Sequence, residues 1–137
     1  MTNAPPPEAR VGVLLVTHGR LGRFFLDTMR EMLDELPLPT EVLEVRRIQD
    51  TELLQRDGLR IIERLDQGRG VLIITDAFGS TPSNIATRLR SSGRTRVLAG
   101  LNLPMLVRIF NYPQLDLEAL AQAAVEGGQR GVMLCDD

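Results

Sequence analysis

The single histidine of this chain, His18, is the side chain best suited to chemistry, and it directly follows the apolar run VGVLLVT. Taken alone, one histidine more often has a structural role than a catalytic one, because both ring nitrogens can be used in hydrogen bonds. The segment Asp76–Asn84 adds a carboxylate, a glycine, several small residues and the start of a helix. Backbone N–H groups and the positive end of a helix dipole attract anions. Together the two segments predict a nucleophile beside a cradle for a phosphate group.

Asp76 directly follows a second apolar run, GVLIIT, so it is predicted to lie at the end of another strand. A carboxylate there can accept the proton of one imidazole nitrogen, which leaves the lone pair of the other nitrogen facing an electrophile. The ordinary alternative for such an aspartate is a turn or helix-capping role. The candidate catalytic residues are therefore His18 and Asp76, and the candidate phosphate-binding residues are Thr17, Gly79, Ser80 and Thr81.

The composition excludes several other classes of function. All 16 basic residues are arginines, so neither Schiff-base chemistry on a lysine nor a P-loop lysine is available. The formal net charge of -2 at pH 7 gives no reason to expect nucleic acid or an anionic membrane as a partner. No apolar run is long enough to insert into a bilayer, and the amino terminus does not resemble a targeting signal. With a single cysteine, Cys135, we expect a protein of the reducing cytoplasm.

The candidate residues need a scaffold, and the apolar pattern predicts strands that alternate with helices. Continuous or loosely alternating apolar runs predict strands at 11–18, 41–45, 70–75, 96–100 and, near the end of the chain, 131–134. Apolar residues at helical spacing predict helices at 21–36, 54–65, 82–89, 103–110 and 117–126. The first helix is expected to stop before Pro37 and the last at Gly127 and Gly128. Thr81 is the expected N-cap of the third helix, with Pro82 in its first position.

This alternation is typical of a parallel sheet with right-handed crossover connections, here one doubly wound α/β domain over residues 11–137. Residues 1–10 contain three consecutive prolines and are expected to form a flexible lead-in. If the sheet has the common strand order 2-1-3-4, its first and third strands are neighbours at the switch point. His18 and the segment 76–84 would then lie side by side at the carboxyl edge of the sheet.

Phosphoryl transfer through a phosphohistidine is the reaction that these residues favour. The chain has no GxGxxG motif after its first strand, no GxSxG motif and no second histidine to share a metal ion. We therefore expect no cofactor and no bound metal. In such a transfer the protein mainly positions the phosphoryl group and stabilises its charge.

Three motifs resemble the mannose-type EIIA component of the bacterial phosphotransferase system. They are Thr17-His18-Gly19 after the first strand, DAFGSTPSN at 76–84 after the third, and NLPML at 102–106 after the fourth. Each motif is modest alone, but the three fall at strand ends in the order that the family shows. The resemblance covers Val11 to about Leu134.

The resemblance implies a histidine phosphocarrier. His18 would accept a phosphoryl group from the phosphocarrier protein HPr and pass it to a sugar-specific EIIB component, expected to be a separate protein because the chain ends at Asp137. Asp76 would match the aspartate that holds the histidine. Thr81 keeps a hydroxyl where many relatives carry serine, whereas Ser80 replaces their usual second glycine. The likeness also implies a homodimer in which a C-terminal antiparallel strand, residues 131–134, is exchanged between the two chains.

Two other interpretations stay open at this point. A regulatory phosphoprotein of an incomplete phosphotransferase system, without sugar transport, would have the same site as a transport relay. A flavodoxin-like ligand binder has the same fold class, but the chain carries few aromatic residues to stack a flavin, so this interpretation ranks lower.

Because a phosphocarrier admits two partners to one histidine, we expect the surface around His18 to be shallow and apolar. Phe78 and Met105 are the expected partner contacts.

Overall fold

A parallel sheet with the strand order β2-β1-β3-β4 forms the centre of the protein, as the sequence predicts. The computed structural model describes residues 4–91 and 93–136. Within them the strands are β1 (Gly12–His18), β2 (Thr40–Val45), β3 (Val71–Thr75) and β4 (Thr95–Ala99). β1 pairs in parallel with both β2 and β3, and β3 pairs in parallel with β4. The first and third strands are therefore neighbours, which brings the two candidate segments to one edge.

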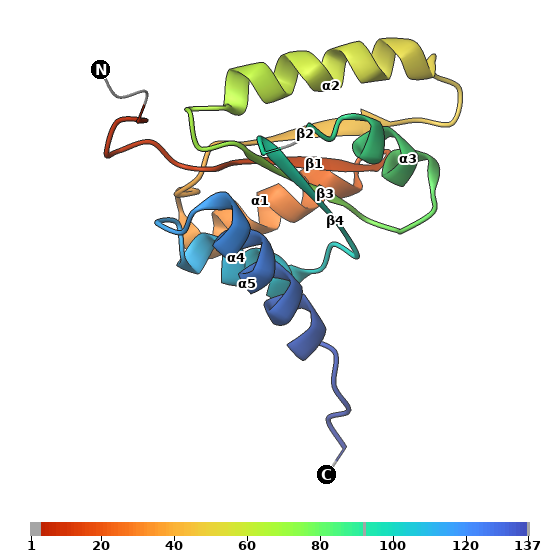
Figure 1. The fold of residues 1–137 in the computed structure, drawn as a ribbon. Coiled ribbons are helices and arrows are strands. Elements are labelled where there is room, and N and C mark those ends of the chain that lie inside the picture. The colour runs from red at the N-terminus through yellow and green to blue at the C-terminus, as the bar shows by residue number, and fades with distance from the viewer. Residues whose placement is uncertain (1–3, 92, 137) are drawn as a thin grey trace.

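Helices cover both faces of the sheet (Figure 1). One layer contains α2 (Thr51–Leu65) and α3 (Thr81–Arg88), and the other contains α1 (Leu21–Leu33), α4 (Leu103–Asn111) and α5 (Leu117–Arg130). None of the helices in the described part of the chain is both long and apolar enough to cross a membrane. The arrangement is the doubly wound α/β fold expected from the alternating pattern.

Successive residues of the central strand β1 face opposite helical layers. Val13 and Leu15 belong to the apolar core shared with α1, α4 and α5, whereas Leu14 and Val16 belong to the core shared with α2 and α3. All four side chains are completely buried. A strand that is covered on both faces needs apolar residues at every position, which accounts for the unbroken run in the sequence.

Two helices end at positions that the sequence pattern did not predict, and α1 is the first of them. It stops at Leu33, before the predicted end at Leu36. Asp34 follows with a φ of 63°, and its backbone N–H donates to the carbonyl of Arg30. Aspartate adopts such left-handed conformations more readily than most residues. The helix therefore ends with Asp34 as its C-cap, before the chain reaches the prolines at positions 37 and 39.

The last helix, α5, continues through Gly127 and Gly128, which the sequence pattern predicted as its end. α4 packs closely against these glycines. A Cβ atom at Gly127 would lie 2.6 Å from Cβ of Arg108, and one at Gly128 would lie 3.0 Å from Cε of Met105. The glycines thus allow a close approach of two helices, and they do not terminate α5.

The structure contradicts part of the prediction for the N-terminal segment, whereas the exchange of a C-terminal strand between two chains stays a prediction. Ala9, within the predicted flexible lead-in, is buried, and the backbone N–H of Arg10 donates to Oε1 of Gln67 at 2.8 Å. At the other end, residues 131–134 pair with no strand inside the described single chain. The segment leads away from the sheet (Figure 1), and its three apolar side chains are exposed. A strand here would need a pairing partner from outside this chain.

The ladder between β1 and β2 reaches further toward the carboxyl edge than the ladder between β1 and β3. The last pair with β3 is Val16 with Thr75, whereas pairing with β2 continues to His18 with Val45. The backbone N–H of Gly19, with a φ of 48°, also donates to the carbonyl of Val45 at 2.9 Å. The pairing of β1 with β3 therefore stops two residues before His18, and the side chain of Asp76 connects the two strand ends there.

Candidate functional site

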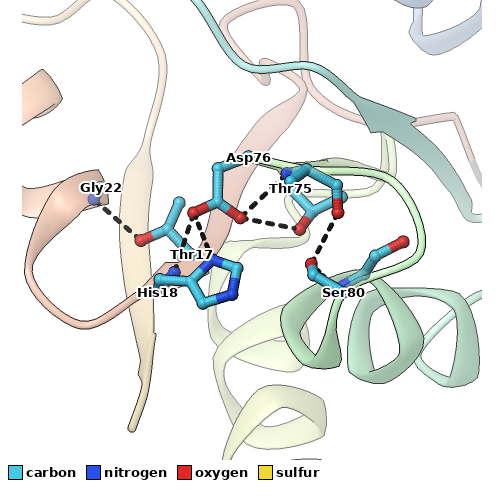
Figure 2. Close-up of polar contacts among 8 residues, drawn as sticks. Thr17, His18, Gly22, Thr75, Asp76 and Ser80 are labelled. Atoms are coloured by element: carbon cyan, nitrogen blue, oxygen red, sulfur yellow. Dashed lines mark hydrogen bonds and ion pairs between the residues drawn. The ribbon is translucent and has the colours of Figure 1, made fainter.

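His18 and Asp76 meet at this edge through two hydrogen bonds (Figure 2). Nδ1 of His18 lies 2.8 Å from Oδ2 of Asp76, and the backbone N–H of His18 donates to the same oxygen at 3.0 Å. An ionised carboxylate can only accept, so Nδ1 carries the hydrogen. Neutral His18 then has its lone pair on Nε2, which points away from Asp76 in Figure 2. The side chain of His18 is 57% exposed, so a reactant can approach the ring from solvent.

The carboxylate of Asp76 is held firmly in its ionised state. Its side chain is only 9% exposed. Burial raises the pKa of Asp76, but the backbone N–H and the imidazole of His18 lower that pKa more, so it lies below its usual range. The other oxygen, Oδ1, accepts the backbone N–H of Ala77 at 3.0 Å. Asp76 therefore offers a fixed negative charge to the ring that it orients.

The loop between β3 and α3 satisfies many of its own polar groups. Ser80 is the N-cap of α3, so the prediction that Thr81 caps this helix is wrong, and Pro82 takes the second helical position instead of the first. The hydroxyl of Ser80 accepts the backbone N–H of Ser83 at 3.4 Å, and the backbone N–H of Gly79 donates to Oγ of Ser83 at 3.2 Å. Serine fits the cap because its side chain replaces a missing backbone acceptor. The backbone N–H of Gly79 and the hydroxyl of Ser80 are thus used inside the loop.

Thr17, also predicted to bind phosphate, is completely buried. Its Oγ1 accepts the backbone N–H of Gly22 in the first turn of α1 at 2.8 Å (Figure 2). A Cβ atom at Gly22 would lie 2.9 Å from this oxygen, so glycine is needed for the close approach. The contact fixes the start of α1 on the end of β1. Of the four predicted phosphate-binding residues, only Thr81 lines the cleft beside His18.

That cleft, which we call the His18 cleft, has a volume of about 530 Å³ and lies between the β2–α2 connection and the start of α3. Its lining includes His18, Arg46, Arg47, Gln49 and Thr81. Sequence reasoning missed both arginines, although they directly follow a predicted strand whose end lies at the same edge as His18. The surroundings of His18 are therefore not apolar throughout, because two arginines line the cleft beside it.

The two predicted partner contacts differ in their exposure. Phe78 is 89% exposed and lies in the loop that follows Asp76. Met105 is only 3% exposed and belongs to the core that α4 and α5 share with the sheet. Its backbone N–H donates to Oδ1 of Asn102, the N-cap of α4, and its side chain packs against Gly128 of α5. Met105 is thus a packing residue in this chain, and its prediction as a surface contact is wrong.

Comparison with known proteins gives a consistent match. A sequence model of the EIIA-man family, described as "PTS system fructose IIA component", matches residues 12–125. The mannose-specific EIIAB component of the phosphotransferase system from Escherichia coli is 29% identical over 125 residues, which cover 89% of this chain. The match covers 38% of the length of that relative, so this chain corresponds to a minor part of it.

Solved structures with the same fold agree with this match. The mannose/sorbose-specific IIA subunit from Enterococcus faecalis superimposes with a TM-score of 0.82 at 25% identity, over 93% of this chain and 96% of that one. A phosphotransferase system EIIA component from Streptococcus agalactiae has a TM-score of 0.74 at 19% identity, over 90% and 95% of the two chains. The second likeness supports the fold only.

Proposed function

Because this chain belongs to the EIIA-man family of the phosphotransferase system, we propose that it is a phosphocarrier that accepts a phosphoryl group on His18 and passes it on. The observation that carries the proposal is the contact between Asp76 and Nδ1 of His18, which leaves Nε2 of an exposed side chain as the nucleophile. A neutral imidazole has a free lone pair on one ring nitrogen, which can attack phosphorus without first losing a proton.

In the accepting step, the lone pair of Nε2 forms a bond to phosphorus while the phosphorus–nitrogen bond of the donor's phosphohistidine breaks. The electron pair of the broken bond stays on the donor's ring nitrogen. The proton on Nδ1 of His18 does not move, and the ring becomes a cation, whose charge Asp76 stabilises across 2.8 Å. The passing step is the reverse, with the acceptor's nucleophile attacking phosphorus.

The donor in this proposal is an HPr-like phosphocarrier and the acceptor is an EIIB-like protein. A side chain that serves two macromolecular partners in turn must be reachable from the surface, and the imidazole is 57% exposed. Phe78 lies two residues from Asp76 and is 89% exposed, which makes it the apolar contact that either partner would cover. Its aromatic ring would lose water on docking and so contribute to binding.

We also propose that the protein forms a homodimer through residues 131–134. Val132 and Leu134 are 80% and 87% exposed in the single chain, so both are available to an outside partner. β4 is one of the two edge strands of the sheet, and Leu98 in it is only partly buried. An unpaired edge and an unpaired apolar segment are each costly in water, and a second copy of the chain can satisfy both.

The central test is phosphorylation with purified components. The protein is incubated with phosphoenolpyruvate, enzyme I and HPr, and the product is examined for a phosphate that is labile in acid and stable in base. His18→Ala should abolish the label, while a phosphate that persists in this variant would disprove the assignment. Addition of a mannose-type EIIB protein to the labelled wild type should then remove the phosphate from this chain.

A further inference from the structure

We infer that the His18 cleft is a binding site for a phosphate group and that Arg47 is its principal ligand. The inference rests on the proposed function, because the phosphate group in question is the one carried by His18. It assigns a role to the connection between β2 and α2, a segment that contains none of the predicted site residues.

The sheet register puts Arg47 close to the nucleophile. Val45, the last residue of β2, pairs directly with His18, and its carbonyl accepts the backbone N–H of Gly19 at 2.9 Å. Arg46 and Arg47 are the next two residues of the chain, and both line the cleft with His18. The backbone N–H of Arg46 donates to Oε1 of Gln49 at 2.7 Å, which folds this connection into a tight turn. Arg46 and Arg47 thus lie in a folded connection that borders the same cleft as His18.

Of the two arginines, Arg47 is the one whose guanidinium charge is not paired with a carboxylate in the described part of the chain. Nη2 of Arg46 lies 2.6 Å from Oε1 of Glu44, a carboxylate that Arg23 also contacts at 3.1 Å. The Arg23 contact, against the opposing effect of desolvation, keeps the pKa of Glu44 below its usual value, so the pair stays ionised. Arg47 forms no ion pair or side-chain hydrogen bond with residues 4–91 or 93–136.

The rest of the cleft also suits an anion. Its lining, as far as the structure describes the chain, contains no carboxylate. It does contain the hydroxyl-bearing residues Thr51 and Thr81 and the amide of Gln49, whose oxygen is already used. The amide nitrogen and the hydroxyls remain as donors. A guanidinium group binds phosphate oxygens with two parallel hydrogen bonds, which a point charge cannot do.

The first test uses inorganic phosphate and the unphosphorylated protein, so it does not depend on phosphoryl transfer. Phosphate is titrated while NMR follows the side-chain N–H signals of the arginines. Wild type and His18→Ala should show saturable shifts at Arg47, and Arg47→Gln should bind phosphate about tenfold more weakly. Arg47→Lys, which keeps the charge but loses the planar fork, should fall between them.

Arg60→Gln is the matched control, because Arg60 is an exposed arginine of α2 that contacts Asp57 at 3.9 Å. It should bind phosphate like the wild type. Equal affinity in Arg47→Gln and wild type, or an absence of shifts at Arg47, would overturn the inference even if His18 is phosphorylated normally.

The second test asks whether the phosphoryl group on His18 is itself the ligand. Phosphoramidate can phosphorylate histidine without a protein donor, with ammonia as the leaving group. Phosphorus NMR over a range of pH then gives the second pKa of the bound phosphoryl group. A neighbouring guanidinium lowers that pKa, so Arg47→Gln should raise it by about 1 unit, while Arg60→Gln should leave it unchanged.

The two tests separate the possible failures. If inorganic phosphate binds through Arg47 but the phosphoryl pKa is the same in all variants, the cleft takes free phosphate and its link to His18 is wrong. If enzyme I and HPr label no residue, the phosphocarrier proposal fails, while the titration with inorganic phosphate still decides whether the cleft binds anions.

Discussion

Oδ2 of Asp76 accepts two hydrogen bonds from one residue, the backbone N–H of His18 at 3.0 Å and Nδ1 of its ring at 2.8 Å. One carboxylate oxygen therefore fixes both the main chain and the side chain of the nucleophile. Few rotamers of His18 are compatible with both bonds, so the direction of Nε2 is set before any partner arrives.

Asp76→Asn should slow phosphorylation of His18 by roughly 10- to 100-fold, the effect of losing a charged hydrogen bond of about 1.5–3 kcal/mol. The amide keeps the shape of the carboxylate but cannot neutralise the imidazolium that forms during transfer. Rapid-quench measurement with phosphorylated HPr gives the rate, and circular dichroism checks the fold. Transfer at the wild-type rate would leave Asp76 with a purely structural role.

Phe78→Ala should weaken HPr binding by about tenfold without changing the chemistry at His18. The side chain is 89% exposed, so its removal should alter the free energy of unfolding by less than about 0.5 kcal/mol. Phosphorylation by phosphoramidate, which needs no docking, should be unchanged. Tyr112→Ala is the matched control, since Tyr112 is a half-exposed aromatic residue at the far end of α4. Equal losses in both variants would count against a docking role for Phe78.

Removal of residues 131–137 should convert the proposed dimer to monomers in light scattering, because the exposed apolar segment can no longer pair with a second chain. Leu134→Asp keeps the chain length and should weaken the dimer in the same direction, which helps if the truncated protein is insoluble. A soluble truncated protein that remains a dimer would show that the two chains associate elsewhere.

Asp66→Asn should destabilise the protein by about 1–3 kcal/mol at neutral pH, and the difference from wild type should shrink in acid. Oδ1 of Asp66 accepts the backbone N–H groups of Gly68 and Gly70, and Oδ2 pairs with Arg94. Burial raises the pKa of Asp66, but Arg94 and the two N–H groups lower it more.

The sign of this pH effect follows from the lowered pKa. A carboxyl group with a depressed folded-state pKa contributes stability above its unfolded pKa of about 3.9, and loses it as the pH falls through the folded value. Urea unfolding of wild type and Asp66→Asn at neutral pH and near pH 3 measures the difference. A constant difference at both pH values would mean that ionisation of Asp66 contributes nothing.

Sequence alone predicted the sheet well because its two central strands are buried on both faces. Runs such as residues 11–17 and 71–75 leave no polar face, and few structures besides a covered parallel strand produce such short, unbroken apolar runs. The strand order then places His18 and Asp76 together. Their contact could be predicted because it depends only on which strand ends are neighbours.

Features that depend on tertiary packing were harder to predict. Gly127 and Gly128 suggested a helix end, but their role is set by α4, which lies earlier in the chain and packs against them. Met105 follows a helix-capping asparagine at a strand end, and only the packing of α4 shows that its side chain points inward. Arg46 and Arg47 carry no motif, and their closeness to His18 depends on how far the β1–β2 ladder extends.

The unequal length of the two ladders around β1 divides the site into a stiff half and a compliant half. The backbone N–H of Gly19 donates to Val45 of β2 and that of His18 donates to Asp76, so both amide hydrogens should exchange slowly with solvent. Phe78 and Gly79, in contrast, lie in an exposed loop beyond the last β1–β3 pair. Two partners of different shape would therefore meet an acceptor atom that stays in place and a rim that adapts. The geometry of phosphoryl transfer can then be the same in both directions, although the surfaces that deliver and remove the phosphate differ.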